Sequence, residues 1–345
     1  MSLRDEILEQ PDAVARLLDA GPAAYAALGT ALQARRPRFA VIAARGSSDH
    51  AGLYAQYLLA VRNRLLVALA TPSTITLYGA RPEMADALVV GISQSGRSPD
   101  IVAVIEEARR QGALTVAITN EPSSPLAEAA AEVIDLGAGP ELATAATKTY
   151  TTQLTAVALL SGALDPLGAA EHAEIARVPE LMHRALSTEA EVRQVVDRMP
   201  RSERSAVLGR GYSYATAREW ALKLQELAQL PAIPFSAADF EHGPLALVEP
   251  GYPVLAVAPS GEPLDAQLGL LRRLRDELGA RVLVISDSAA ARELDEGLHL
   301  PEGIPGWLSP LVEILPGQWY AYHLARARGL DPDKPRAISK VTRTR

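Results

Sequence analysis

Two carboxylates and an amine stand at helical spacing in the second half of the chain. Glu219, Lys223 and Glu226 are separated by four and three residues, which places them on one face of a helix. Such a triplet is commonly an exposed ion pair worth roughly a few tenths of a kcal/mol. Large apolar residues flank it here, which favours a charged stripe that faces a crevice. His242 follows in a loop-like stretch beside a Gly-Pro break, and a carboxylate with an imidazole suits proton transfer on a sugar.

Two short segments of the first half are rich in hydroxyls, one over residues 45–50 and the other over residues 93–99. Backbone N–H groups at the start of a helix, together with clustered hydroxyls, suit a phosphate. Helix capping explains any single serine equally well, but two such segments at one sheet edge favour a phosphorylated ligand. The candidate phosphate-binding hydroxyls are those of Ser47, Ser48, Ser93, Ser95 and Ser98.

The elements that must position these residues alternate between strands and helices. Strand-like runs at 39–44, 87–92 and 114–119 alternate with helical patterns at 50–61 and 99–111. Apolar strands of this kind, joined by helices, indicate an α/β fold with a parallel sheet covered on both faces. Such sheets bind ligands at the carboxyl ends of their strands, which is where both hydroxyl-rich segments lie.

The second half repeats the first at a fixed offset. Arg45 and Gly46 correspond to Arg210 and Gly211, 165 residues further on, and other motifs keep that offset. We therefore predict two duplicated, doubly wound parallel-sheet domains with helices on both faces. The repeat has lost most hydroxyls, so we expect phosphate binding in the first domain and proton transfer in the second. The predicted division is a helical segment at 1–35, a first domain at 36–165, a connecting helix at 166–198, a second domain at 199–330 and a tail at 331–345.

Composition excludes several classes of site. The 345 residues contain no cysteine, so we expect no disulfide, zinc ribbon, iron–sulfur cluster or thiol nucleophile. The six histidines lack metal-binding spacings, and nucleotide-loop motifs are absent, so we expect no metal, no cofactor and a small phosphorylated metabolite as ligand. The net charge of −7 and the lack of a signal peptide or a membrane-length apolar run predict a cytoplasmic protein without nucleic-acid or membrane partners.

Several separated motifs resemble the tandem sugar isomerase (SIS) domain family. They are Ser93-Gln-Ser-Gly, the run from Ala145 to Leu154, Glu219-x3-Lys-x2-Glu, His242-Gly-Pro-Leu-Ala and Lys340-Val-Thr. They occur in the family's order, and the likeness, which covers nearly the whole chain, is to the isomerase half of glucosamine-6-phosphate synthase. The resemblance implies two doubly wound domains and a homodimer with active sites near the subunit interface.

The resemblance also implies a role for each candidate residue. The serines and Gln94 would hold the sugar phosphate, with Gly46, Thr144 and Ala146 among the substrate-binding residues. Glu226 would move a proton between C1 and C2, with Glu219 and Lys223 beside it. His242 of the neighbouring subunit would assist ring opening. Lys340 would meet the open-chain sugar, through a Schiff base in the synthase.

The chain departs from the synthase in ways that resemble stand-alone SIS-type glucosamine-6-phosphate deaminases. The glutaminase domain with its cysteine nucleophile is missing, the segment 45–48 reads Arg-Gly-Ser-Ser, and Ala146 replaces a serine. We therefore predict a deaminase that converts glucosamine 6-phosphate to fructose 6-phosphate and ammonia. The alternatives are a sugar-phosphate isomerase, a synthase-type aminotransferase without its glutaminase domain, and a non-catalytic sugar-phosphate sensor.

Overall fold

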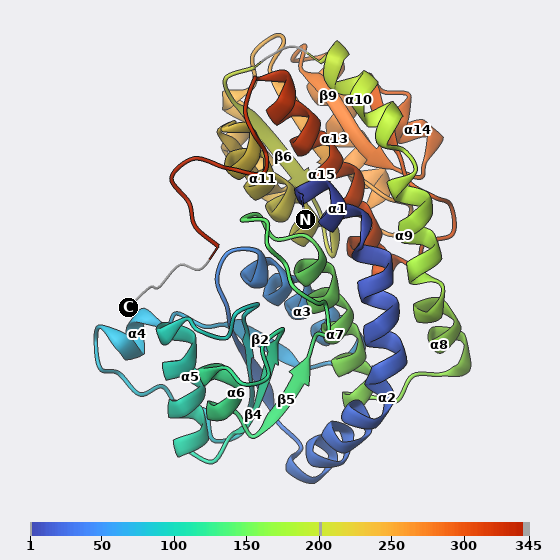
Figure 1. The fold of residues 1–345 in the computed structure, drawn as a ribbon. Coiled ribbons are helices and arrows are strands. Elements are labelled where there is room, and N and C mark those ends of the chain that lie inside the picture. Colours follow the sequence, from blue (N-terminus) through green and yellow to red (C-terminus); the bar gives the residue numbers. More distant parts are fainter. Residues whose placement is uncertain (1, 200–201, 341–345) are drawn as a thin grey trace. The chain divides into compact units, whose positions relative to one another are not determined.

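The computed structural model describes residues 2–199 and 202–340, apart from the side chains of 21–24 (Figure 1). The chain forms two compact units. The N-terminal unit comprises Asp12–Leu142, Ala146–Ala176 and residues 339–340 at the end of the described chain. The C-terminal unit comprises Arg177–Ile338, Ala143–Ala145 and the leading segment up to Pro11.

The N-terminal unit is built on a parallel five-stranded sheet in the order β2-β1-β3-β4-β5. Its strands are β1 (Phe39–Ala43), β2 (Leu66–Leu69), β3 (Ala87–Ile92), β4 (Leu114–Thr119) and β5 (Glu132–Asp135). Its helices are most of α2 (Gln10–Arg35), then α3 (Ser47–Asn63), α4 (Ser73–Thr76), α5 (Pro99–Arg110), α6 (Pro125–Ala129), α7 (Lys148–Leu164) and α8 (Ala169–Ala176).

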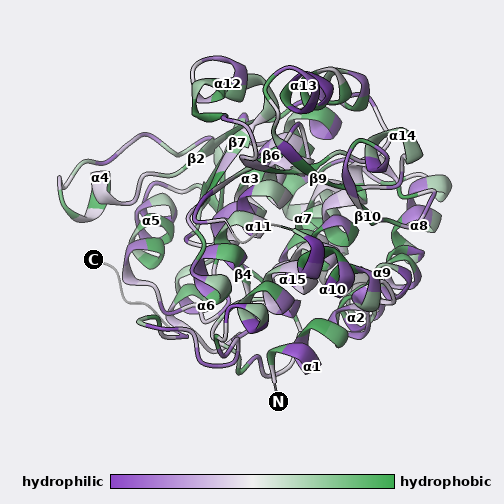
Figure 2. Ribbon diagram, turned by 90° about the horizontal axis from the view of Figure 1, so that it is seen from above, coloured by the Kyte–Doolittle hydropathy of each residue, from purple (hydrophilic) through white to green (hydrophobic). Residues whose placement is uncertain are grey.

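Helices cover both faces of this sheet. Apolar residues of α5 and α6 form one core with Ala43, Val89 and Ala117. On the other face α3 packs closely against β1. A Cβ added at Gly52 of α3 would lie only 3.1 Å from the side chain of Ile42. Strands β3 and β4 are buried at every residue, as expected of strands covered on both sides. Most of the surrounding helices alternate between hydrophobic and hydrophilic residues along their length (Figure 2).

The C-terminal unit has its own parallel five-stranded sheet, in the order β10-β9-β8-β6-β7. Its strands are β6 (Ser205–Gly209), β7 (Ala232–Ser236), β8 (Pro253–Val257), β9 (Arg281–Ser286) and β10 (Glu296–His299). Its helices are α1 (Leu3–Leu8), α9 (Val178–Leu186), α10 (Glu189–Arg198), α11 (Ser213–Ala228), α12 (Ala237–Glu241), η1 (Pro244–Leu247), α13 (Leu264–Asp276), α14 (Ala289–Arg292), η2 (Gly306–Leu308) and α15 (Ser309–Ala327). Helices α12, α13 and α14 share one core with the sheet, and α11 and α15 pack together.

The predicted duplication is confirmed by the topology. In both sheets the second strand of the unit lies at one edge and is followed by the first, third, fourth and fifth. Gly46 and Gly211, separated by the predicted offset, both have positive φ, at 57° and 62°, and both join the first strand of a sheet to its helix. The fold class predicted from the sequence is therefore correct.

Two local predictions are wrong. The segment 166–198, expected as one connecting helix, contains α8, α9 and α10, with Arg177 and the pair 187–188 between them. The stretch after Phe235, expected to be loop-like, completes β7 and then forms α12 and η1. Burial explains the second difference, because Ala237 and Phe240 anchor α12 in the core of the unit.

Candidate active site

The first serine segment follows β1 and begins α3. The positive φ of Gly46 turns the chain at this point, and α3 has no side-chain cap. Ser48 is buried, and its hydroxyl accepts a hydrogen bond of 3.0 Å from Gln153 Nε2 on α7. Ser47 is half-buried at the first position of α3. The hydroxyl of Ser48 is thus oriented by a neighbouring helix rather than used to cap its own.

The second serine segment is held in a tight turn after β3. Ser93 N–H donates to Ile118 O and so extends the pairing of β3 with β4. The Ser93 hydroxyl accepts from Gly96 N–H at 3.2 Å. Gly96 has a φ of 61°, and a Cβ added there would lie 2.0 Å from Ser124 Oγ. Only glycine fits this turn without displacement of its neighbours.

The remaining residues of this segment stay accessible. Gln94, Ser95 and Ser98 are half-buried. The Ser95 hydroxyl accepts from Arg97 N–H at 3.4 Å, and Ser98 precedes α5 without a side-chain cap. Helix capping by a side chain, the alternative role for these serines, is therefore not the role of Ser98.

An ion pair joins the two serine segments. Arg45 Nε and Nη2 both lie 2.8 Å from Asp100 Oδ2, and Asp100 is buried at the start of α5. Strands β1 and β3 are direct neighbours, so their carboxyl ends lie at one edge of the sheet. The N-termini of α3 and α5 meet at the same edge, which suits an anion.

A cavity of about 650 Å³ opens beside the second serine segment, within the N-terminal unit. Gln94 and Ser95 line it together with Lys340, which comes from the far end of the chain. Lys340 Nζ lies 2.5 Å from Glu141 Oε2. The other polar side chains on its wall are Arg97, Asn120, Glu121, Asp135 and Glu141. The two residues that follow Lys340 in the resemblance motif lie outside the described residues.

The other predicted substrate-binding residues do not line this cavity. Ser47 and Ser48 follow the carboxyl end of β1, and Ser93 and Ser98 follow that of β3. Thr144 and Ala146 are half-buried in the segment between Glu141 and α7. The backbone of that segment is fixed by Glu6, whose two carboxylate oxygens each accept from Ala143 N–H at 3.2 Å.

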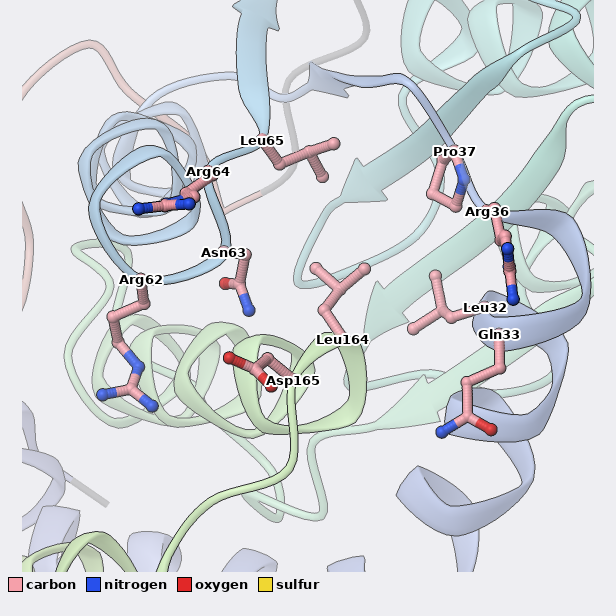
Figure 3. Close-up of a pocket in the computed structure, with 10 residues that line it drawn as sticks. All are labelled: Leu32, Gln33, Arg36, Pro37, Arg62, Asn63, Arg64, Leu65, Leu164 and Asp165. Atoms are coloured by element: carbon pink, nitrogen blue, oxygen red, sulfur yellow. The ribbon is translucent and has the colours of Figure 1, made fainter.

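A second cavity in the N-terminal unit, of about 710 Å³, carries none of the predicted site residues (Figure 3). Figure 3 shows Arg62 and Arg64 on one side of it and Arg36 on the other, with Leu32 and Leu164 between them. Arg62 is paired with Glu171 at 2.5 Å. The guanidinium groups of Arg36, Arg62 and Arg64 do not converge on one point (Figure 3), so this cavity is not the candidate site.

The carboxylate–amine triplet of the C-terminal unit is buried. Lys223 Nζ lies 3.3 Å from Glu219 Oε1 and 2.5 Å from Glu226 Oε2. The side chains of Lys223 and Glu219 are 1% and 0% exposed, whereas that of Glu226 is 21% exposed. Burial alone would lower the pKa of Lys223, but the two carboxylates outweigh burial and raise it. The triplet is therefore not a surface ion pair, and Glu226 is its accessible end.

Packing of α11 against α15 buries this triplet. Trp220 of α11 is fully buried and meets Tyr320 edge to face, with the ring centroids 5.7 Å apart. It also lies over Gly317, where an added Cβ would come within 3.1 Å of the indole. Close approach of the two helices removes the charged stripe from water, which spacing alone did not predict.

The structure does not bring His242 and Glu226 together within one chain. Helix α11 starts at the carboxyl end of β6, and Glu226 is its fourteenth residue, roughly 20 Å along the helix axis. His242 follows α12, which begins at the carboxyl end of β7, and its side chain is exposed. The two residues thus belong to opposite ends of this sheet.

The C-terminal unit has a buried carboxyl where the N-terminal unit has its first serine segment. Ser213 and Thr216 of α11 donate to Glu313 Oε1 and Oε2, each at 2.9 Å. Ser213 and Glu313 occupy the repeat positions of Ser48 and Lys148. Burial raises the pKa of Glu313 to about 7 against the effect of these hydroxyls. An anion at this end of the C-terminal sheet would meet the acidic side chain of Glu313, so this end is less suited to an anion than the one that carries the serine segments.

Two features of the site were missed in the sequence. The sequence does indicate the pair Arg45–Asp100, because the second half has an arginine and an aspartate, Arg210 and Asp265, at the two corresponding positions. Glu141 gave no signal, since it is a single acidic residue in a stretch rich in glycine and alanine.

Among the described residues, no three His, Asp or Glu side chains are grouped so that they could hold a metal ion. None of the helices in the described ranges is long and apolar enough to cross a membrane.

Comparison with known proteins identifies the family. A model of the SIS domain matches residues 35–161 and 199–326. An isomerizing glutamine–fructose-6-phosphate aminotransferase from Methanothermobacter thermautotrophicus is 36% identical over 304 residues, which cover 86% of this chain and 50% of that protein. The chain thus spans about half the length of the curated relatives it matches.

Solved structures agree with this match. The C-terminal domain of glucosamine-fructose-6-phosphate aminotransferase from Francisella tularensis has a TM-score of 0.85 at 28% identity, over 95% of this chain and 97% of that one. Glucosamine-6-phosphate deaminase from Thermotoga maritima shares the fold, with a TM-score of 0.80 at 20% identity over 99% of each chain. The resemblance inferred from the motifs is confirmed. With two matched domains and homology to the isomerase half of these aminotransferases, the chain belongs to the SIS domain family.

Proposed function

We propose that the protein moves a proton between C1 and C2 of a phosphorylated amino sugar, and that it converts glucosamine 6-phosphate to fructose 6-phosphate and ammonia. The observation that carries the proposal is the buried triplet of the C-terminal unit. Lys223 lies between two carboxylates, and only Glu226 is accessible to a ligand. A carboxylate held in this way can accept and return a proton without leaving its position.

The serine segments of the N-terminal unit supply the phosphate-binding group. Gly46, Ser47, Ser48, Ser93, Gln94, Ser95 and Ser98 belong to the sheet edge where α3 and α5 begin. The Arg45–Asp100 ion pair keeps the two segments together. Thr144 and Ala146 are proposed as further substrate contacts.

Proton transfer and loss of ammonia then follow in order. His242 of a second copy assists ring opening to the free aldehyde. Glu226 takes the proton from C2 and returns it to C1, and a proton passes from the amino group to the C1 oxygen, which together convert the 2-amino aldose to the imine of the ketose. Water adds to C2 of this imine, and the C–N bond breaks to release ammonia and fructose 6-phosphate. Lys340 stabilises the negative charge that develops on oxygen during the transfer, while the buried Lys223 holds the carboxylate of Glu226 in place.

Deamination is proposed ahead of glutamine-dependent synthesis because the segment 45–48 and Ala146 resemble the stand-alone deaminases. The named relatives are aminotransferases, and the deaminase is similar in fold only. The second candidate is therefore a sugar-phosphate isomerase, because it would use the same Glu226 without an amino group on the substrate.

Ammonia release from glucosamine 6-phosphate tests the proposal. The protein should produce ammonia and fructose 6-phosphate in equal amounts, and Glu226→Gln should lose at least about a hundredfold in rate. Interconversion of glucose 6-phosphate and fructose 6-phosphate without ammonia release would support the isomerase instead. Binding of sugar phosphates with no turnover of any of them would support the sensor.

The separation of His242 and Glu226 supports a homodimer in which each active site uses both chains. Glu226→Gln and His242→Asn should each be inactive as pure proteins. After the two are mixed and allowed to exchange subunits, half of the dimers contain one intact site, so about a quarter of wild-type activity should return. If no activity returns although mass spectrometry shows mixed dimers, His242 does not act across subunits.

A further inference from the structure

Glu141 forms part of the wall of the cavity that contains Lys340. Its side chain is fully buried, whereas the side chain of Lys340 is 24% exposed. Lys340 Nζ donates to Glu141 Oε2 at 2.5 Å. Gln94 and Ser95 line the same cavity. The ion pair therefore connects an accessible amine to a buried acid beside the second serine segment.

Glu141 is fixed by α7 independently of Lys340. Its Oε1 accepts from the backbone N–H groups of Thr147 and Thr149, at 2.9 and 3.1 Å. Its Oε2 accepts from Thr149 Oγ1 at 2.8 Å. The N-cap residue of α7, Thr147, makes no side-chain cap of its own. Glu141 thus caps α7 from outside the helix, and three hydrogen bonds fix the carboxylate.

Lys340 lacks a comparable support from its own segment. Residues 331–340 contain turns and bends but no helix or strand. A charged hydrogen bond to a buried carboxylate is strong, because little water competes for the carboxylate. The position of the lysine is consequently set by Glu141 and not by local secondary structure.

We propose that Glu141 is a positioning residue that holds the ammonium of Lys340 at the cavity wall, beside Gln94 and Ser95. There the ammonium meets an oxygen of the open-chain sugar phosphate. This role rests on the proposed function, since it assigns Lys340 to the same substrate. The carboxylate acts through the lysine, because its oxygens are already bonded to α7 and to Lys340.

Trypsin cleavage after Lys340 tests the anchoring without any substrate. The folded protein should be cut slowly at this bond, because the lysine must leave Glu141 to enter the protease. Glu141→Gln should be cut about tenfold faster at this site, as followed by mass spectrometry. Glu128→Gln, on an exposed residue of the same unit, is the matched control and should behave like the wild type. Equal cleavage of Glu141→Gln and wild type would overturn the proposal.

A second variant controls for a folding defect. Glu141→Asp keeps the charge but shortens the side chain by one methylene, and its cleavage rate should lie between those of the wild type and Glu141→Gln. Thermal unfolding of each variant shows whether α7 is retained. An Asp variant that folds normally but is cut no faster than wild type would also count against the anchoring.

A double-mutant cycle tests the catalytic consequence. Glu141→Gln should lower kcat for glucosamine 6-phosphate by about tenfold or more, with a smaller change in KM. The double variant Glu141→Gln/Lys340→Met should be no slower than Lys340→Met alone, because Glu141 acts through the lysine. Independent losses that multiply would contradict a positioning role. If the wild type turns over no sugar phosphate, the proposed function fails, while the cleavage result still decides whether Glu141 anchors the tail.

Discussion

Replacement of the buried Glu313 by glutamine should remove a defined part of the pH dependence of stability. Burial raises the pKa of this carboxyl from its ordinary value near 4.5 to about 7, although hydroxyls of Ser309, Thr216 and Ser213 oppose the rise. The folded protein therefore binds this proton more tightly than the unfolded chain. The resulting stabilisation is complete below about pH 4.5 and is lost as the pH rises through 7.

The magnitude follows from the two pKa values. Their separation of about 2.5 pH units corresponds to about 3 kcal/mol in total, of which about 2.5 kcal/mol is lost between pH 5 and pH 8. The glutamine variant has no such loss. Urea unfolding of both proteins at pH 5, 6, 7 and 8 should show the free energy of unfolding of Glu313→Gln rising relative to wild type by about 2.5 kcal/mol over that range.

Comparison of the two proteins at each pH cancels the titration of every other group. A constant difference across the range would show that Glu313 titrates alike in the folded and unfolded states. A difference that falls with pH would mean that the carboxyl is stabilised as an anion, contrary to its burial.

Three further substitutions test other parts of the structure. Gly96→Ala should lower the free energy of unfolding by about 2–3 kcal/mol in urea, because its Cβ would collide with Ser124 at a residue of positive φ; an unchanged value would refute the tight turn. Lys223→Met should cost about 3–5 kcal/mol, since it leaves two carboxylates together in a buried site, and a neutral effect in the same assay would mean that the triplet opens to water. Arg45→Met, which frees the second serine segment from the first, should raise KM for the sugar phosphate by about tenfold with little change in kcat, and a loss confined to kcat would contradict a role in phosphate binding.

Much of the fold was predictable because buried parallel strands have a plain signature. The strands predicted at 87–92 and 114–119 have the bounds of β3 and β4 in the structure. Every residue in them is buried, so each strand forms one continuous run in the sequence. Edge strands of four residues such as β2 and β5 were missed. Their residues alternate irregularly between buried and exposed positions, and so resemble loops.

The site was only partly predictable, because burial depends on partners far along the chain. The spacing of Glu219, Lys223 and Glu226 fits an exposed helix face as well as a buried one. Only the packing of α11 on α15, through Trp220 and Gly317, decides between them. Likewise, nothing near Glu141 in the sequence indicates that it meets a lysine 199 positions away.

Deuterium incorporation into fructose 6-phosphate is the most direct test of the central claim that Glu226 moves a proton between C1 and C2. The protein is incubated with fructose 6-phosphate and ammonium in D₂O, and the C1 protons are followed by NMR. Wild-type protein should exchange a C1 proton for deuterium, and Glu226→Gln should do so at least about a hundredfold more slowly. Absence of exchange with the wild type, or exchange that persists in Glu226→Gln, would contradict the assignment of Glu226 as the proton-transfer residue.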